Sequence, residues 1–223
     1  IYQYFVESDI DGRPIGRIFR SLIYQRAKGD IATTPFGTQL NVNESGYEWM
    51  NHSISAKDVK DLPDDLRVIV GGDQCQQKYD ASVFNISAMS FGSLSKNAIL
   101  ALNKGAKADN FAHNTGEGGL SPYHLKHGGD LIWQIGTGYF GCRDSNGDFD
   151  KENFIKNVSN ESVKMVEVKL SQGAKPGHGG ILPARKNTNE IAKIRGVKPY
   201  TDIISPPFHS SFNTPLELLN FIQ

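Results

Sequence analysis

Residues 169–180, KLSQGAKPGHGG, place two lysines six residues apart, with Gln172 between them and glycine at four of the twelve positions. The segment follows the run VKMVEV, which reads as a strand. A lysine that ends a buried strand can place its ammonium group beside a carboxylate or a ring carbonyl, and glycines let backbone N–H groups approach a ligand closely. A lone loop lysine is most often simply solvated. This glycine-set pair instead predicts a site for a compact anionic ligand.

Two further loops carry polar groups that could act on a ligand. NTGEGG, residues 114–119, presents a hydroxyl group, exposed amides and Glu117, which could be a polar gate or a general base, although an isolated loop glutamate is usually solvated. Gln134 lies near the end of the apolar run LIWQI, where an amide can bind the hydrogen-bonding edge of a heterocycle or simply cap the strand. These loops are therefore candidate parts of the same site.

Other chemistries find little support. The spacing of His113, His124, His127 and His178 matches no zinc signature, and two distant cysteines cannot form a metal knuckle, so no metal site is predicted. The sequence has no G-x-S-x-G elbow, no G-x-G-x-x-G that opens a helix after a strand, and no P-loop motif. Covalent hydrolysis, a Rossmann domain and a P-loop nucleotidase are thus disfavoured.

The elements that must position these loops alternate between strands and helices. An amphipathic helix is predicted within residues 93–110, capped by Ser93 or Ser95, and another helix at 189–195, ended by Gly196. Further predicted helices lie near 18–27, 59–62, 151–158 and at the C-terminus after a capping box of Thr214, Pro215 and Glu217. Predicted strands lie at 83–90, 111–114, 131–135 and 163–170, with a short one inside 61–72.

The strand at residues 163–170 alternates in character. Its two faces are Val166, Val168 and Leu170 on one side and Met165, Glu167 and Lys169 on the other. The first face is expected to pack on helices and the second to end in polar, functional groups. Strands that alternate with helices predict an α/β fold with a parallel sheet, whose loops after the strands form the ligand face in a barrel or an open sheet alike.

Composition limits the class of protein. The 223 residues include 24 basic and 24 acidic side chains, so no field of one sign argues for nucleic acid or an anionic membrane. No run approaches 18 apolar residues, and the two cysteines suit a reducing cytosol. We therefore predict an ordinary globular protein of the cytoplasm that binds small molecules.

Several motifs occurring in order resemble the FMN-binding domain of the glutamate synthase family. They are SAMSFGSLSKNAILALNKGA, HNTGEGGLSPYHL, GGDLIWQIGTGYFGCRD, KLSQGAKPGHGGILP and ISPPFHSSFNTPLELL. YQRAKGDIATTPFGTQ and GYEWMNHS resemble the N-terminal extension of stand-alone members. The resemblance implies a (β/α)8 TIM barrel. The resemblance predicts an N-terminal extension at residues 1–80 that packs on the barrel. About four strands can be counted in residues 81–223, which are therefore expected to form roughly the first half of an FMN-binding barrel, truncated at the C-terminus.

The resemblance also implies the reaction and the residues that support it. In such enzymes a reduced flavin passes a hydride to 2-iminoglutarate, formed from 2-oxoglutarate and ammonia, to give glutamate. The implied FMN contacts are Ala88, Met89, Ser90, Thr115, Gln134 and Lys169. Lys175 and Arg195 would hold the carboxylates of the 2-oxo acid with Gln172 as a further donor, and Glu117, near the substrate entrance, would act with Lys169 in catalysis.

Some departures from the family leave alternatives open. The iron–sulfur cluster of the family needs three cysteines in a later segment, and this chain holds no such ligands, while an electron-donor protein or subunit is expected as a partner. One alternative is a non-catalytic barrel fragment that self-associates or needs its missing half. Another is a different phosphate-binding barrel oxidoreductase, such as a nucleotide dehydrogenase, with Cys142 as the nucleophile.

Overall fold

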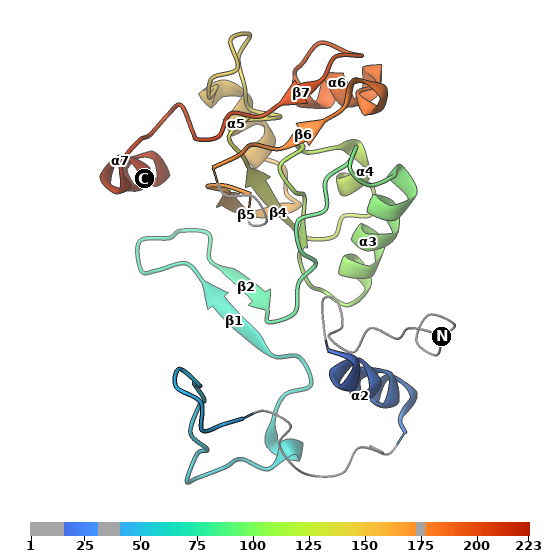
Figure 1. Ribbon diagram of the computed structural model, residues 1–223, viewed down its shortest axis with the longest axis vertical. Coiled ribbons are helices and arrows are strands. Elements are labelled where there is room, and N and C mark those ends of the chain that lie inside the picture. Colours follow the sequence, from blue (N-terminus) through green and yellow to red (C-terminus); the bar gives the residue numbers. More distant parts are fainter. Residues whose placement is uncertain (1–15, 31–40, 173–176) are drawn as a thin grey trace. The chain divides into compact units, whose positions relative to one another are not determined.

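The computed structural model describes residues 16–30, 41–172 and 177–223 (Figure 1). The chain divides into two compact units, Ile1–Val59 and Lys60–Gln223, which we describe separately. In the first unit, helix α2 spans Arg17–Lys28, which confirms the helix predicted near residues 18–27. It ends at Gly29, whose φ of 71° is the left-handed conformation that glycine adopts without steric cost.

The second unit begins with a short hairpin. After the 3-10 turn η1 (Val59–Asp61), strand β1 (Arg67–Val70) pairs antiparallel with β2 (Tyr79–Ser82). The predicted short strand within residues 61–72 is confirmed by β1. Strand β2 was not predicted, because YDAS carries no run of β-branched residues. The hairpin lies entirely in the second unit, and the division into an extension at residues 1–80 and a barrel at 81–223 stays a prediction.

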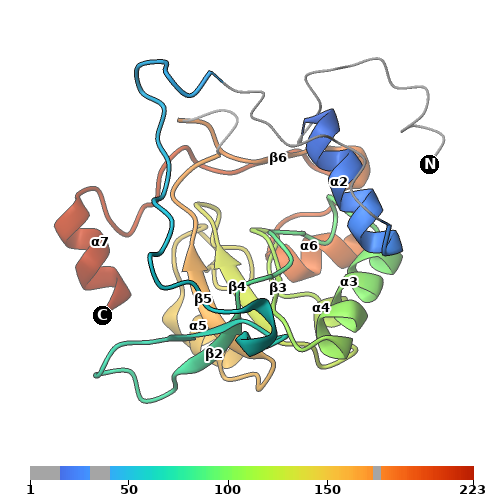
Figure 2. The ribbon, with the colours of Figure 1, turned by 90° about the horizontal axis from the view of Figure 1, so that it is seen from below.

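The centre of the second unit is a parallel sheet of the order β3-β4-β5. Its strands are β3 (His113–Asn114), β4 (Leu131–Ile135) and β5 (Val163–Val168), and Figure 2 shows β4 and β5 side by side. The predicted α/β fold with a parallel sheet is confirmed. Elsewhere among the described residues the sheets have two strands each, and the strands do not close into a barrel.

The strand predicted at residues 83–90 is wrong. This segment runs beside β3 but forms only an isolated parallel bridge between Ile86 and His113. The backbone of Ile86 bonds on both sides, since its N–H donates to the carbonyl of Ala112 at 2.9 Å and its carbonyl accepts the N–H of Asn114 at 3.0 Å. Just before it, the side chain of Asn85 accepts the N–H of Ala112 at 2.9 Å and donates to the carbonyl of Ser82 at 2.7 Å. This side chain therefore occupies the N–H that a longer ladder would use.

Helices follow the strands, as the alternating pattern predicted. Helix α3 (Lys96–Ala108) and the short α4 (Pro122–Leu125) lie together, and α5 (Lys151–Val158) follows the β4 loop (Figure 1). Strands β6 (Ile181–Leu182) and β7 (Ile203–Ile204) form a two-stranded antiparallel pair, and the turn η2 (Ala184–Lys186) and helix α6 (Asn189–Arg195) lie between them in the chain. Helix α7 (Pro215–Ile222) follows β7. Helix α6 ends at Gly196 in the left-handed conformation, as predicted.

The cap of α3 gives a first testable prediction. Ser95 is the N-cap, and its hydroxyl accepts the N–H of Ala98 at 3.3 Å, whereas the hydroxyl of Ser93 accepts from Ser90. We expect Ser95→Ala to lower the free energy of unfolding by about 1 kcal/mol, because it leaves one N–H at the helix start without a partner. Ser93→Ala is the matched control and should cost less than about half of that. Equal losses in urea unfolding would contradict this assignment.

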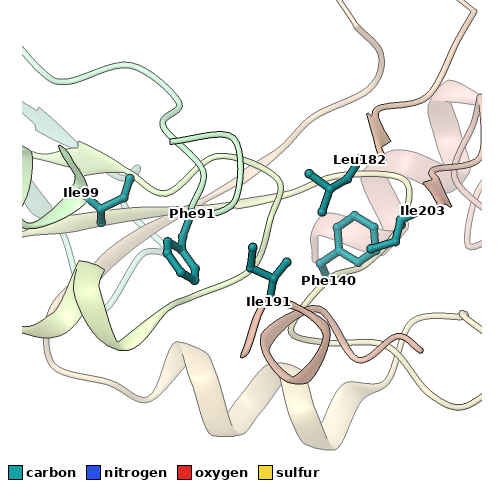
Figure 3. Close-up of a cluster of buried hydrophobic side chains, with 6 residues drawn as sticks. All are labelled: Phe91, Ile99, Phe140, Leu182, Ile191 and Ile203. Atoms are coloured by element: carbon teal, nitrogen blue, oxygen red, sulfur yellow. The ribbon is translucent and has the colours of Figure 1, made fainter. Parts of the chain in front are cut away.

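Three buried clusters hold the second unit together. The first joins the loops after the strands to α3 and α6 and contains Phe91, Ile99, Phe140, Leu182, Ile191 and Ile203 (Figure 3). The second lies between β4 and α5 and contains Trp133, Ile135, Tyr139 and Cys142. The third joins the hairpin to the sheet through Tyr79, Ala81 and Ala112. The loops that carry the candidate site are therefore anchored in packed side chains.

The outward face of β5 differs from its prediction. Helix α5 covers Trp133 on β4, and the apolar side chains of β5 that were expected to pack on helices remain open, with Val166 37% and Leu170 53% exposed. Both line a groove of about 1360 Å³ between β5, α5 and α7. Within the described residues, β5 pairs on one side only, with β4.

Among the helices in the described parts of the chain, none combines the length and the apolar character that crossing a membrane requires.

Candidate functional site

The candidate site lies where the parallel strands end. After β3 comes the loop at residues 115–119, after β4 the loop at 136–142, and after β5 the segment from Lys169 to Gln172. Because the carboxyl ends of parallel strands meet at one edge of the sheet, these three loops come together in space. This places the polar groups of separate sequence motifs in a single cluster.

Three predicted site residues form that cluster. The ammonium group of Lys169 lies 3.0 Å from Oε2 of Glu117 and donates to Oε1 of Gln172 at 3.0 Å. The amide of Gln172 in turn donates to both carboxylate oxygens of Glu117, at 2.9 and 3.1 Å. The side chains of Lys169 and Glu117 are 23% and 19% exposed. The cluster is therefore accessible from solvent and already pairs a cation with an anion.

Glycines make room for the cluster. A Cβ atom on Gly136 would lie 2.9 Å from Oε2 of Glu117, and one on Gly180 would collide with Oε1 of the same carboxylate. Glu117 therefore lies over the end of β4 and against the segment that enters β6. The glycines of this site serve close approach of a side chain, as they could serve close approach of a ligand.

The first predicted flavin loop, residues 88–90, is held against the loop after β3. The N–H of Met89 donates to the carbonyl of Asn114 at 3.1 Å. Gly116, with φ of 65°, packs so closely on Ser90 that an added Cβ would lie 2.8 Å from its backbone nitrogen. Ala88 is exposed beside them. The three residues Ala88, Met89 and Ser90 thus border the same edge of the sheet as Lys169.

His124 fixes this loop from below. Its Nε2 donates to the carbonyl of Met89 at 3.0 Å, and its Nδ1 accepts from the hydroxyl of Ser121 at 2.7 Å. Burial lowers the pKa of His124, which keeps the ring neutral and suits this pattern of one donor and one acceptor. The contact of His124 with the predicted flavin loop was not foreseen from the sequence.

His209 holds the backbone of Lys169 in a similar way. It is buried, and its Nε2 donates to the carbonyl of Lys169 at 2.8 Å, while its Nδ1 lies 3.1 Å from the hydroxyl of Tyr139. Burial lowers the pKa of His209 as well. This residue was missed, because its partners lie 40 and 70 residues away and no local pattern in PPFHSS indicates them.

A polar layer lies directly beneath the cluster. The amides of Asn114 and Gln134 both donate to Oε1 of Glu167, at 3.0 and 2.5 Å. Glu167 is exposed and lies on the face of β5 that was predicted to carry polar groups. Gln134 is buried, and its carbonyl oxygen Oε1 has no hydrogen-bond partner among the described residues. An acceptor in this state is suited to a ligand that brings a donor.

The hydroxyl group of Thr115, a predicted flavin contact, is bonded within the fold. It is fully buried, and its hydroxyl donates to the carbonyl of Gly116 at 3.0 Å and accepts the N–H of Gln134 at 3.1 Å. Its side chain therefore joins the loop to β4. A contact between Thr115 and FMN stays a prediction, and the backbone N–H of this residue is also bonded within the fold, to the carbonyl of Ile132 at 2.9 Å.

Arg195 lies at the border of the site. It is buried, its guanidinium carbon lies 4.9 Å from the centre of the Phe140 ring, and it donates to the carbonyl of Phe91 at 3.5 Å. Burial lowers the pKa of Arg195, and the nearby carboxylate of Glu117 opposes that shift. An added Cβ on Gly118 would lie 2.9 Å from its Nη2. Its predicted partner Lys175 lies outside the described residues.

The described residues offer no metal centre, since they contain no group of three or more histidine, cysteine or acidic side chains that could hold an ion. Cys142, the candidate nucleophile of the alternative barrel chemistry, is fully buried. Burial raises the pKa of its thiol to about 12, which disfavours the reactive thiolate at neutral pH. Cys142 is therefore poorly suited to the role that the nucleotide dehydrogenase alternative gives it.

These groups fit a flavin. An isoalloxazine ring presents a ring N–H and carbonyl oxygens at one edge. The site offers the ammonium group of Lys169 and the Oε1 acceptor of Gln134, which has no partner in the described parts of the chain. Glycine loops on either side allow a flat ring to approach the backbone closely. The geometry so far defines an α/β domain with a polar ligand site at the carboxyl ends of a parallel sheet.

The comparison with known families narrows this class. A model described as the conserved region in glutamate synthase matches residues 48–223, which is most of the chain. The chain therefore belongs to the glutamate synthase family. The predicted resemblance is confirmed, and oxidoreductases are the class of enzyme that the family name implies.

Curated relatives agree with this membership. The glutamate synthase large subunit-like protein YerD of Bacillus subtilis is 45% identical over 163 residues, which cover 72% of this chain and 31% of YerD. The archaeal-type glutamate synthase [NADPH] of Thermotoga sp. is 38% identical over 128 residues, 57% of this chain and 23% of that protein. The glutamate synthase [NADPH] large chain of Bacillus subtilis is 36% identical over 146 residues, which cover 63% of this chain and 9% of that protein. The match spans less than a third of each relative.

Proposed function

We propose that this chain is the part of a glutamate synthase-like oxidoreductase that binds FMN and reduces 2-iminoglutarate, formed from 2-oxoglutarate and ammonia, to glutamate. Family membership supports the class of reaction. The observation that carries the proposal for this chain is the cluster of Lys169, Gln172 and Glu117 at the strand ends, above the unpaired acceptor of Gln134. When bound, FMN would supply the two electrons that the reduction consumes.

The same proposal extends to the fold. Strands β3, β4 and β5 would be consecutive strands of a (β/α)8 barrel, of which residues 81–223 form about the first half. Their parallel order and the polar site at their carboxyl ends support this arrangement. Residues 1–80 would form the extension of the barrel, and the electrons would come from a separate donor protein or subunit.

Each polar residue has a defined task in this proposal. Lys169 would place its positive charge beside the electron-rich edge of the ring, with its backbone held by His209. Arg195, Lys175 and Gln172 would bind the carboxylates of the oxo acid. Glu117 would serve as the polar gate or the acid–base group, and its carboxylate must release Lys169 before an anion can take its place.

The reaction is tested by product formation. The chain is incubated with FMN, dithionite as the reductant, ammonium and 2-oxoglutarate, and glutamate is measured by mass spectrometry. We expect glutamate formation that requires all components and falls at least tenfold in Glu117→Gln, because loss of an acid–base group has at least that effect. Equal glutamate formation with and without the chain would contradict the proposal.

A second candidate function follows from the groove beside β5. Val166, Leu170, Phe221 and Ile222 line it, and β5 offers an edge that is unpaired within the described residues. An open apolar edge favours association, so we propose that a second copy of the chain covers it. Sedimentation equilibrium should show a dimer that Val166→Lys converts to monomer, with Lys164→Glu as a control on the same strand. A wild-type monomer at all concentrations would contradict this candidate.

A further inference from the structure

The polar groups of Asn114, Gln134 and Glu167 form an unusual hydrogen-bond arrangement next to the site. Glu167 receives two amide donors on one oxygen, from Asn114 at 3.0 Å and from Gln134 at 2.5 Å. An ionised carboxylate accepts hydrogen bonds and cannot donate. Each amide must therefore turn its NH2 group, and not its oxygen, toward Glu167.

The side-chain amides of Asn114 and Gln134 differ in the hydrogen bonds of their oxygen atoms. The oxygen of Asn114 accepts the backbone N–H of Gly116 at 3.0 Å, so this side chain is fixed at both ends. The oxygen of Gln134 has no partner among the described residues, although the side chain is only 6% exposed. The orientation of Gln134 is thus set by Glu167, and the group left over is an acceptor.

We propose that Glu167 is a specificity-determining residue, which holds the amide of Gln134 so that its oxygen selects ligands presenting a ring N–H. This inference rests on the proposed function, in which the ligand is a flavin. The N–H that fits is N3–H, which lies between the two carbonyl groups of the ring system. A ligand with an acceptor at that place would face the oxygen of Gln134 and be rejected, because the amide cannot turn without losing its bond to Glu167.

The route to Gln134 passes the polar cluster. Glu117 lies over Gly136, two residues beyond Gln134, where an added Cβ would be 2.9 Å from its carboxylate. The ring edge therefore enters as Glu117 swings away from Lys169. Lys169 and Gln134 therefore have separate tasks. Lys169 binds negative charge near the surface, and the buried Gln134 binds the edge of the ring.

The test compares FMN with 3-methyl-FMN, in which a methyl group replaces the hydrogen on N3. Both keep the ring system and the phosphate, and only FMN brings the N3–H donor. We expect the wild-type chain to bind FMN about tenfold more tightly than the analogue in fluorescence titrations, because the analogue leaves a buried acceptor unpaired. In Glu167→Gln the amide of Gln134 can adopt either orientation, so the ratio should fall below about threefold.

Controls separate this inference from the proposed function. Glu161→Gln removes a carboxylate from the exposed loop before β5 and should keep the tenfold ratio. FMN binding with equal affinity for the analogue would overturn the role of Gln134 and leave the flavin proposal standing. An undiminished ratio in Glu167→Gln would overturn the role of Glu167, and failure of the wild-type chain to bind either ligand would overturn both proposals.

Discussion

Lys169→Ala is expected to lower the affinity of the chain for FMN by about 10- to 100-fold. The ammonium group ends a strand whose backbone is fixed by His209, and it lies at the centre of the polar cluster. Loss of a hydrogen bond to a charged group costs about 1.5–3 kcal/mol, which corresponds to that range in affinity. Quenching of flavin fluorescence in an equilibrium titration measures the change directly.

A lysine on the same strand supplies the control. Lys164 is exposed on β5 and lies at the opposite end from Lys169. Lys164→Ala removes the same charge from the molecule and should change FMN affinity less than about twofold, since exposed charges at a distance are screened by salt. The ion pair with Glu117 is partly exposed, so its loss should affect the free energy of unfolding only slightly. Equal effects of the two substitutions would contradict a specific role for Lys169.

The second large effect is a loss of stability in mild acid. Burial lowers the pKa of His113 to about 4, compared with about 6.5 in an unfolded chain. Both ring nitrogens of His113 are buried, and neither has a hydrogen-bond partner among the described residues. The ring lies 5.2 Å from that of His124, which would add repulsion if both were charged.

The direction of the effect follows from proton binding. Between about pH 6.5 and pH 4 the unfolded chain binds a proton at His113 and the folded chain does not, so stability falls as the pH falls through this window. A shift from 6.5 to about 4 corresponds to about 3 kcal/mol in full. The lowered pKa values of His124 and His209 act in the same direction. Asp144, whose pKa is lowered from 3.8, acts only at more acid pH.

Urea unfolding at pH 7.5 and pH 4.5 measures this loss. His113→Leu removes the buried titrating group, whose ring nitrogens bond to none of the described residues, so the variant should lose about 2–3 kcal/mol less than the wild type between these two pH values. His127→Leu replaces an exposed histidine and should leave the pH dependence unchanged. The same pH dependence in all three proteins would show that burial of His113 does not govern acid stability.

The local patterns of the sequence predicted the long elements well. The helix at residues 151–158 and strand β4 have the predicted bounds. Helix α5 begins after the N-cap Asp150, and β4 is a short apolar run between glycine-containing loops. The strands β6 and β7 were not predicted. Each has two residues, and they pair across an intervening helix, so their signal is the long-range contact and not the local sequence.

The candidate site was predicted in its parts and not in its arrangement. Lys169, Gln172 and Glu117 were each identified from loop composition or family resemblance, but their mutual hydrogen bonds depend on how the loops after β3 and β5 meet. His209 binds a backbone carbonyl 40 residues away, a contact that carries no sequence signature. The flavin and substrate contacts remain predictions.

The most direct test of the account is a titration of FMN with the wild-type chain, followed by quenching of flavin fluorescence. If the loops after β3, β4 and β5 form a flavin site, the chain should bind FMN with one site and a Kd in the micromolar range or below, on the order of −8 kcal/mol. The Lys169→Ala titration described above then locates that site at the strand ends. No quenching at protein concentrations of about 100 μM would contradict the account, and the polar cluster would need another ligand.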